Sequence, residues 1–482
     1  MLGPPLSAID WLSDSVQPVR LEPPVSSNAS APVVITTPLD RASKDAVGLL
    51  PPDRTGLPRT LWQASREADL LTLLARDRSD VPPALQNLTR VMMLTEATPP
   101  ADSGADDTFF LARVDRLLAM GAIEEAKALI EEAGPDTPAL FRRWFDTALL
   151  TGDENRACDV MLDRPDVAPT YIAQVFCIAR GGDWMAAALT LNSHRALENI
   201  DAAEEALAAR FLDPEIFEGE PPLDPPARVT PLAFRMHEAI GERLPAQGLP
   251  LAFAHADLRD VVAWKSQIEA AERLSRRGAI SENRLLELYT ARDPAASGGV
   301  WDRAAAVQAM DAAIGSGNTR EVARLLPETW ALMQAARLEL PFARLYGQRL
   351  GLMGLTGPAG DLALRIGLLS PAYLEVAQAA EGRLPFLTAL ARGVPQEVQA
   401  DGALRLAVQD AFNGAPPPQE IAQLLDEGRT GEAILRAIDA LGEGSALDAR
   451  HAGEAIAVLR AAGLEDVARR TALQLLLLER PS

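Results

Sequence analysis

The sequence has few of the residue types that perform catalysis or bind metals and phosphates. Its 482 residues include four histidines, two cysteines and three lysines. No two histidines stand at the spacing of a zinc-ligand pair, and no lysine follows a glycine-rich loop in the manner of a phosphate-binding loop. A Gly-x-Ser-x-Gly motif, which would mark a nucleophilic serine, is also absent. The sequence therefore predicts a protein without cofactor, metal or catalytic residues.

The charge balance argues against nucleic acid as a partner, and the hydropathy argues against a membrane-spanning segment. The chain has 46 basic and 67 acidic residues, for a net charge of −21. This charge repels phosphate backbones, so nucleic acid is not expected as a partner. No apolar run approaches the ~18 residues that cross a bilayer, so no integral membrane segment is expected.

The N-terminal stretch MLGPPLSAIDWLSDS lacks the basic region and the apolar region of an export signal. A start rich in Pro, Ser and Ala is nevertheless typical of an exported protein after cleavage of its signal. A periplasmic or exported location is therefore the first expectation, and a cytoplasmic location is the alternative.

Helix-forming residues dominate a chain with little aromatic surface. Apolar residues make up 48% of the sequence but aromatic residues only 5%, so Ala, Leu and Val must fill the core. Ala and Leu lead the helix propensities, and Ala lets helices approach closely. We expect an all-α fold.

Residues 1–58 are expected to form a disordered arm, because their Pro, Ser and Ala bury too little apolar surface to offset the entropy of ordering. The arm contains one short amphipathic motif, SAIDWLSDSV, in which Trp11 is a candidate for docking to a partner. Packing of this motif onto the same chain is an equally good interpretation.

A repeating pattern follows the arm. Three glycines, spaced by 31 and 30 residues, are each followed five residues later by alanine and preceded eleven residues earlier by an aromatic. The glycines are Gly121, Gly152 and Gly182, the alanines Ala126, Ala157 and Ala187, and the aromatics Phe110, Phe141 and Tyr171. The pattern predicts helix pairs with a buried aromatic on the first helix, a left-handed turn at glycine and a closely packed alanine on the second helix.

This layout resembles the tetratricopeptide repeat, and in the best unit the resemblance extends to Ile130, Ala133 and Pro138. The period is nearer 30 than the family's 34 residues, a consistent Leu-Gly pair is missing from the first helices, and His194 replaces a small residue of the third unit. The resemblance covers Thr108 to Asn199. It implies an α-solenoid of antiparallel helix pairs.

Proline-rich breaks divide the helical body, because proline removes backbone donors that a helix needs. The expected organisation is a set of tetratricopeptide-like repeats at 59–212, a linker at 213–231, a second helical block at 232–412, a linker at 413–420 and C-terminal helical hairpins at 421–482. The glycine spacing recurs without the aromatic before Val322, Ala433 and Ala468.

The two cysteines are expected to face each other. Cys158 lies on the second helix of one unit and Cys177 on the first helix of the next, and their midpoint falls in the connecting loop DRPDVAP. In antiparallel helices, residues equidistant from the turn lie level with each other. The pair predicts a disulfide in an oxidising compartment, or a reduced core pair in the cytosol.

These features indicate a non-catalytic helical-repeat scaffold or adaptor that binds protein partners of unknown identity in the bacterial cell envelope. The stretches PLSAIDWLSDSV and RRWFDTALLTG also resemble an uncharacterised set of bacterial helical proteins predicted to be exported, which implies location only. The alternatives are the superhelix of an envelope enzyme similar to lytic transglycosylases and a cytosolic regulatory adaptor.

The resemblance to tetratricopeptide repeats also implies a binding surface on the first helices of the pairs. The candidates there are Arg113, Arg142, Arg143 and Gln174. These arginines would favour an acidic or C-terminal carboxylate ligand, because arginine binds carboxylates through two hydrogen bonds. Pairing with nearby acids such as Asp115 and Asp146 is the alternative interpretation.

Overall fold

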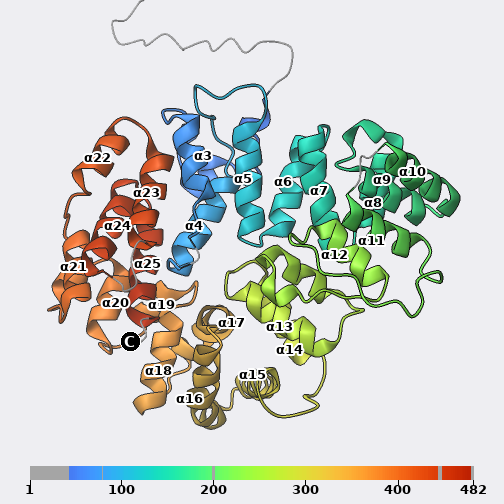
Figure 1. Cartoon of the computed structure of the whole chain (residues 1–482). Coiled ribbons are helices and arrows are strands. Elements are labelled where there is room, and N and C mark those ends of the chain that lie inside the picture. Colours follow the sequence, from blue (N-terminus) through green and yellow to red (C-terminus); the bar gives the residue numbers. More distant parts are fainter. Residues whose placement is uncertain (1–42, 79, 198–200, 443–447, 479–482) are drawn as a thin grey trace, which may run out of the picture. The chain divides into compact units, whose positions relative to one another are not determined.

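The computed structural model describes residues 43–78, 80–197, 201–442 and 448–478, and over these residues the chain is all-α without a β-strand. The helices before the first long proline-rich break are α2 (Pro52–Thr55), α3 (Glu67–Ala75), α4 (Pro83–Leu94), α5 (Thr108–Ala119), α6 (Ile123–Ala133), α7 (Pro138–Thr151), α8 (Glu154–Asp163), α9 (Tyr171–Arg180), α10 (Trp184–Ala196) and α11 (Ala202–Leu212) (Figure 1).

The helices after this break follow one another to the last described residues. They are α12 (Pro231–Ala239), α13 (Trp264–Ser275), α14 (Glu282–Thr290), α15 (Val300–Gly315), α16 (Thr319–Ala335), α17 (Glu339–Leu352), α18 (Gly357–Leu368), α19 (Tyr373–Gln378), α20 (Pro385–Arg392), α21 (Ala403–Phe412), α22 (Gln419–Asp426), α23 (Thr430–Gly442), α24 (Ala449–Ala461) and α25 (Glu465–Leu477). The expected linkers 213–231 and 413–420 thus fall almost entirely between helices.

The helix pairs turn at the glycines that the sequence pattern identifies. Gly121, Gly152 and Gly182 have φ angles of 73°, 92° and 91°, in the left-handed region that glycine enters without steric cost. The alanines that follow each of them by five residues are fully buried. These local predictions are confirmed.

The same geometry recurs in the second half of the chain. Gly317, Gly428 and Gly463 have φ angles of 67°, 76° and 78°. The residues five positions later, Val322, Ala433 and Ala468, are fully buried. One turn chemistry therefore serves helix pairs throughout the described part of the chain.

The third predicted aromatic is wrong. Phe110 and Phe141 are fully buried, but Tyr171 is 42% exposed and stacks on His194 with 3.7 Å between the ring centroids. Tyr171 is the first residue of α9, whereas the other two aromatics lie further inside longer helices. The buried aromatic of α9 is instead Phe176, whose ring centroid lies 5.5 Å from that of Phe211.

The expectation of a disordered arm is wrong for residues 43–58. Asp45 is fully buried, and its carboxylate accepts a hydrogen bond of 2.7 Å from the backbone N–H of Phe110. Leu57 is buried as well, and the N–H of Leu49 donates to the carbonyl of Leu94. The segment 43–58 therefore belongs to the folded unit, while residues 1–42, including Trp11, lie outside the described residues.

The last helices pack onto the first (Figure 1). Helix α25 contacts α4, where the side chain of Gln474 accepts a hydrogen bond of 2.7 Å from the backbone N–H of Ala84. Helix α23 contacts α3, and the N–H of Gly431 donates to the carbonyl of Leu61 at 3.0 Å. In an open solenoid each unit contacts only its neighbours, so this end-to-end packing is a feature that the tetratricopeptide resemblance does not imply.

The packing of the turn-proximal alanines can be tested in α10. Replacing the fully buried Ala187 by Leu should lower the free energy of unfolding by about 1–3 kcal/mol, because the added methyl groups have no space. Replacing the exposed Ala196 of the same helix by Leu is the control and should change stability little. Urea denaturation measures both, and an equal effect of the two changes would contradict close packing at position 187.

Candidate functional site

Arg113, predicted to lie on a binding surface, is fully buried, so that prediction is wrong. Its guanidinium donates to the carbonyls of Met93 (2.6 and 3.0 Å), Asp45 (3.0 Å) and Val47 (2.8 Å). These carbonyls belong to the end of α4 and to the segment before α2, which covers α5. Burial lowers the pKa of Arg113 to about 10, so the side chain stays charged at neutral pH.

The other predicted surface residues do not form a free basic surface. Arg142 is exposed, but Arg143 binds the carboxylate of Asp115 through two contacts of 2.6 Å. Burial raises the pKa of Asp146 to about 6, against the opposing effect of Arg142 and Arg143. The side chain of Gln174 is half-buried and donates to the carbonyl of Pro165. The pairing of Arg143 with Asp115 agrees with the alternative interpretation.

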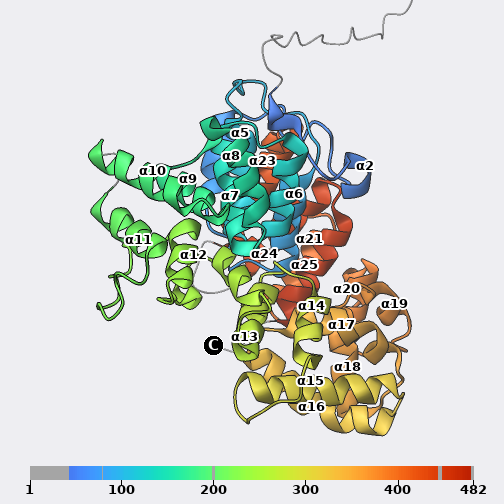
Figure 2. The ribbon, with the colours of Figure 1, turned by 90° about the vertical axis from the view of Figure 1, so that its right-hand side faces the viewer.

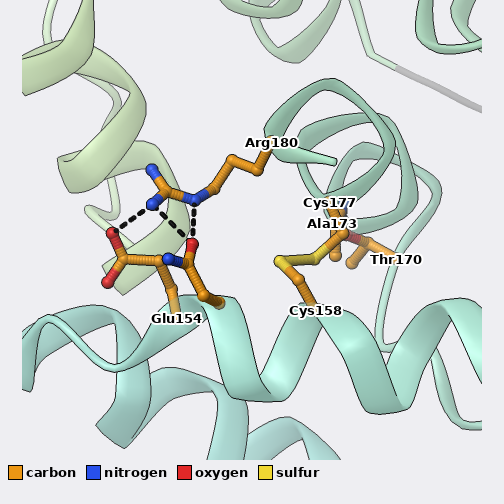
Figure 3. The surroundings of a disulfide bond; sticks show 7 residues. Glu154, Cys158, Thr170, Ala173, Cys177 and Arg180 are labelled. Atoms are coloured by element: carbon orange, nitrogen blue, oxygen red, sulfur yellow. Dashed lines mark hydrogen bonds and ion pairs between the residues drawn. A yellow bond between two sulfur atoms is a disulfide. The ribbon is translucent and has the colours of Figure 1, made fainter. Parts of the chain in front are cut away.

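A disulfide joins α8 to α9 (Figure 3). Cys158 and Cys177 are both buried, with their Cα atoms 4.9 Å apart. Beside them, Arg180 reaches from α9 back to α8, where its Nη2 lies 3.4 Å from Glu154 and donates to Asn155 at 2.6 Å. The pair α9/α10 is thus fixed to the preceding unit by a covalent bond and by polar contacts.

Exposed apolar side chains gather in and around this helix pair. Seven of the eleven large apolar residues that are exposed in the described part of the chain lie between positions 162 and 216: Leu162, Tyr171, Trp184, Met185, Leu189, Leu197 and Ile216. Isolated exposed apolar residues are common on protein surfaces, but clusters mark interaction sites. The concentration in one short stretch makes it the strongest candidate for a partner-binding surface.

The apolar face of α10, defined here as Met185 and Leu189, is the centre of this region. These side chains are 83% and 68% exposed, whereas Trp184 lies at the edge of the buried side, with its ring 5.9 Å from that of Phe211. The opposite side of the helix packs inward through Ala187 and Leu191, the two residues of α10 that are buried. Figure 2 shows α10 at the outer edge of the helices around α9 and α11. A helix with apolar residues on both sides, of which only one side is covered, can bury the other against a partner.

A large cleft of about 860 Å³ lies among α4, α6, α14 and α17, with the end of α7 and residues of the segment 255–260 in its wall. Its charged residues oppose one another: Arg90 lies 4.0 Å from Glu125, and Arg344 lies 3.9 Å from Glu282. Burial lowers the pKa of His255 in its wall, and the Nε2 atom lies 2.8 Å from the carbonyl oxygen of Gly121. The imidazole is therefore engaged in holding the turn of the α5/α6 pair.

Two further features bear on function, namely metal sites and membrane-spanning helices. In the described ranges, no group of three or more His, Cys, Asp or Glu residues is arranged to hold a metal ion. No helix among those same residues has both the length and the apolarity needed to cross a membrane.

Comparisons of the chain with protein-family models, with curated proteins and with solved structures gave no match. The all-α fold class therefore rests on the helices themselves, and every functional statement has to rest on this chain's own surfaces.

Sequence reasoning missed the apolar face of α10, although a signal was present. In the stretch WMAAALTL, the positions of Ala187 and Leu191 form one helical face, and those of Met185 and Leu189 form a second apolar face. A helix that is apolar on both sides outside a crowded core indicates a surface that a partner covers.

Replacing Arg113 by Met should lower the free energy of unfolding by about 3–5 kcal/mol, because the change leaves buried carbonyl groups without their charged hydrogen-bond donor. The exposed Arg142 is the matched control, and its change to Met should alter stability by less than about 0.5 kcal/mol. Chemical denaturation measures both. Equal stabilities would show that Arg113 does not hold the segment 43–58 in place.

Replacing both Cys158 and Cys177 by Ala should lower the free energy of unfolding by about 2–4 kcal/mol, because the cross-link restricts the unfolded chain. Thermal unfolding with and without reductant provides the measurement. Denatured protein isolated from its native compartment should contain no free thiol. Titration of two thiols would contradict the disulfide and favour a cytosolic location.

Proposed function

We propose that the protein is a non-catalytic helical scaffold that binds a partner protein through the apolar face of α10. The observation that carries this proposal is the concentration of exposed apolar side chains around α9 and α10, with Met185 and Leu189 one helical turn apart on the same side. Residues at this spacing form the ridge that packs into the groove of another helix.

The composition of the face suits a protein partner. Met is enriched at the centres of interfaces, where a few buried side chains supply most of the binding energy. Burying side chains of this size contributes about 1.5–3 kcal/mol each. An apolar or amphipathic helix of the partner is the expected ligand, in place of the acidic ligand for which Arg113, Arg142 and Arg143 were candidates.

A location in the bacterial cell envelope is part of the proposal. Disulfides persist in oxidising compartments, and the buried bond between Cys158 and Cys177 supports an exported protein. The tetratricopeptide resemblance of the region 108–199 supports a binding role, since such helix pairs present surfaces to peptides and helices.

The chemical groups of the cleft that His255 lines also favour a scaffold over an enzyme. His255 is engaged with a backbone carbonyl, and the hydroxyl of Ser281 accepts a hydrogen bond of 3.2 Å from the backbone N–H of Arg284 at the start of α14. These two side chains, which could act as base or nucleophile, are thus used to fix a turn and a helix end.

Photo-cross-linking in cells of the native organism tests the binding surface. A benzophenone amino acid replaces Met185 in one variant and Val261 in another, since both positions are 83% exposed. The proposal predicts a discrete cross-linked species from position 185, because a partner covers α10, and none from position 261. The same cross-links from both positions would count against a specific surface.

A charge variant separates binding from folding. Met185→Glu combined with Leu189→Glu should leave the helical circular dichroism and the melting temperature nearly unchanged, because both side chains are exposed. For this test the cross-linking amino acid is placed elsewhere on α9 or α10. The charge variant should then no longer form the cross-linked species that the wild-type sequence forms. Retention of that species at the wild-type level would show that another surface holds the partner.

A further inference from the structure

A second pocket lies where the turns after α13 and α16 meet. It has a volume of about 550 Å³. Its lining consists of four arginines and three apolar residues: Arg273, Arg276, Arg277, Arg337, Leu251, Ala335 and Ala336. No described acidic residue lines this pocket, although acids outnumber bases by 67 to 46 in the chain. We call it the arginine pocket.

Arg337 occupies a backbone position that this chain elsewhere gives to glycine. Its N–H donates to the carbonyl of Gln334 at 3.1 Å, and the next N–H, of Leu338, donates to that of Met333 at 2.8 Å. The same pair of bonds closes the turns at Gly317 and Gly463. The φ angle of Arg337 is 57°, in the region that disfavours residues with a Cβ atom.

The side chain at this strained position is not used within the protein. The Arg337 guanidinium is exposed and makes no hydrogen bond or ion pair with the described residues. A preference for basic residues at helix C-termini accounts for arginines near the end of α13. It does not require an arginine at a turn position where glycine fits better. Strained residues of this kind concentrate at functional sites.

Two other arginines of the pocket are held in place by the protein. Arg276 donates through Nε to the carbonyl of Ala336 at 2.6 Å, and Arg273 donates to the carbonyl of Ala246 at 2.8 Å. The acid beside them, Glu272, also accepts hydrogen bonds from Tyr289 (2.8 Å) and Arg303 (2.7 Å), so its charge is shared. Nη2 of Arg276 also donates to Oε2 of Glu272 at 3.4 Å, so this one carboxylate, which is not part of the pocket lining, is shared by Arg276, Arg303 and Tyr289.

Positive charges within and beside the cluster repel one another. Burial lowers the pKa of Arg276, Glu272 raises it, and the positive charges of Arg303 and Arg337 lower it further. Burial also lowers the pKa of Arg273, Asp257 raises it, and Arg276 lowers it. An anion between these groups would replace mutual repulsion by attraction.

We propose that the arginine pocket binds a small molecule that carries a phosphate or pyrophosphate group. Several guanidiniums around one site match the oxygens and the double charge of a phosphate, and a volume of about 550 Å³ suits a small ligand. The apolar wall formed by Leu251, Ala335 and Ala336 would contact an organic part of the ligand. This site is separate in sequence and structure from the apolar face of α10.

Titration calorimetry of the full chain with pyrophosphate tests the proposal, at constant ionic strength maintained by chloride. The expected result is saturable binding at one site. Arg337→Gly should weaken the affinity by about tenfold or more, since it removes a charged donor. The same variant should keep or raise the melting temperature of the free protein, because glycine accepts the φ angle.

The control variant is Arg320→Ala, at the opposite end of α16, where an exposed side chain carries the same charge. It should bind pyrophosphate like the wild type. Binding that citrate matches in affinity would overturn the phosphate class, and equal loss in both variants would show general charge attraction. No saturation at millimolar pyrophosphate would overturn the site itself.

Discussion

The packing of the last helices onto the first is the contact on which the rest of the structure depends. Trp62 is fully buried against Gly431, where a Cβ atom would lie 2.5 Å from the indole ring. The Nε atom of the buried Arg78 lies 2.6 Å from Asp439 on α23. One hydrophobic cluster accordingly contains residues from Leu57 near the start of the folded unit to Leu475 near its end. Segments separated by most of the chain thus stabilise each other.

This constraint explains which helix faces are covered and which stay exposed. Because α3 and α4 are covered by α23 and α25, the ends of the folded unit do not present open helix faces of the kind that cap a solenoid. The uncovered apolar face lies instead within the chain, on α10, held by the disulfide that joins α8 to α9. The arginine pocket lies in another segment, where the ends of α13 and α16 meet.

The helical hairpins could be predicted from the sequence because their determinants are local. Glycine at a left-handed turn and a small residue five positions later are enough to place Gly121 and Ala126 correctly. The burial of Arg113 could not be predicted, because two of the carbonyls that it binds come from a distant segment assigned to a disordered arm. The end-to-end packing and the arginine pocket were missed for the same reason. Both depend on residues far apart in sequence, such as Arg276 and Arg337.

Native-state hydrogen exchange in low denaturant measures the central contact most directly, because it reports the opening free energy of each helix. The end-to-end packing predicts that the backbone amides of α4 and α25 become exposed in one shared opening with a common free energy. A stack of independent helix pairs would instead lose its ends one after another. Opening of α25 at a clearly lower free energy than α4, with α4 still protected, would contradict the account.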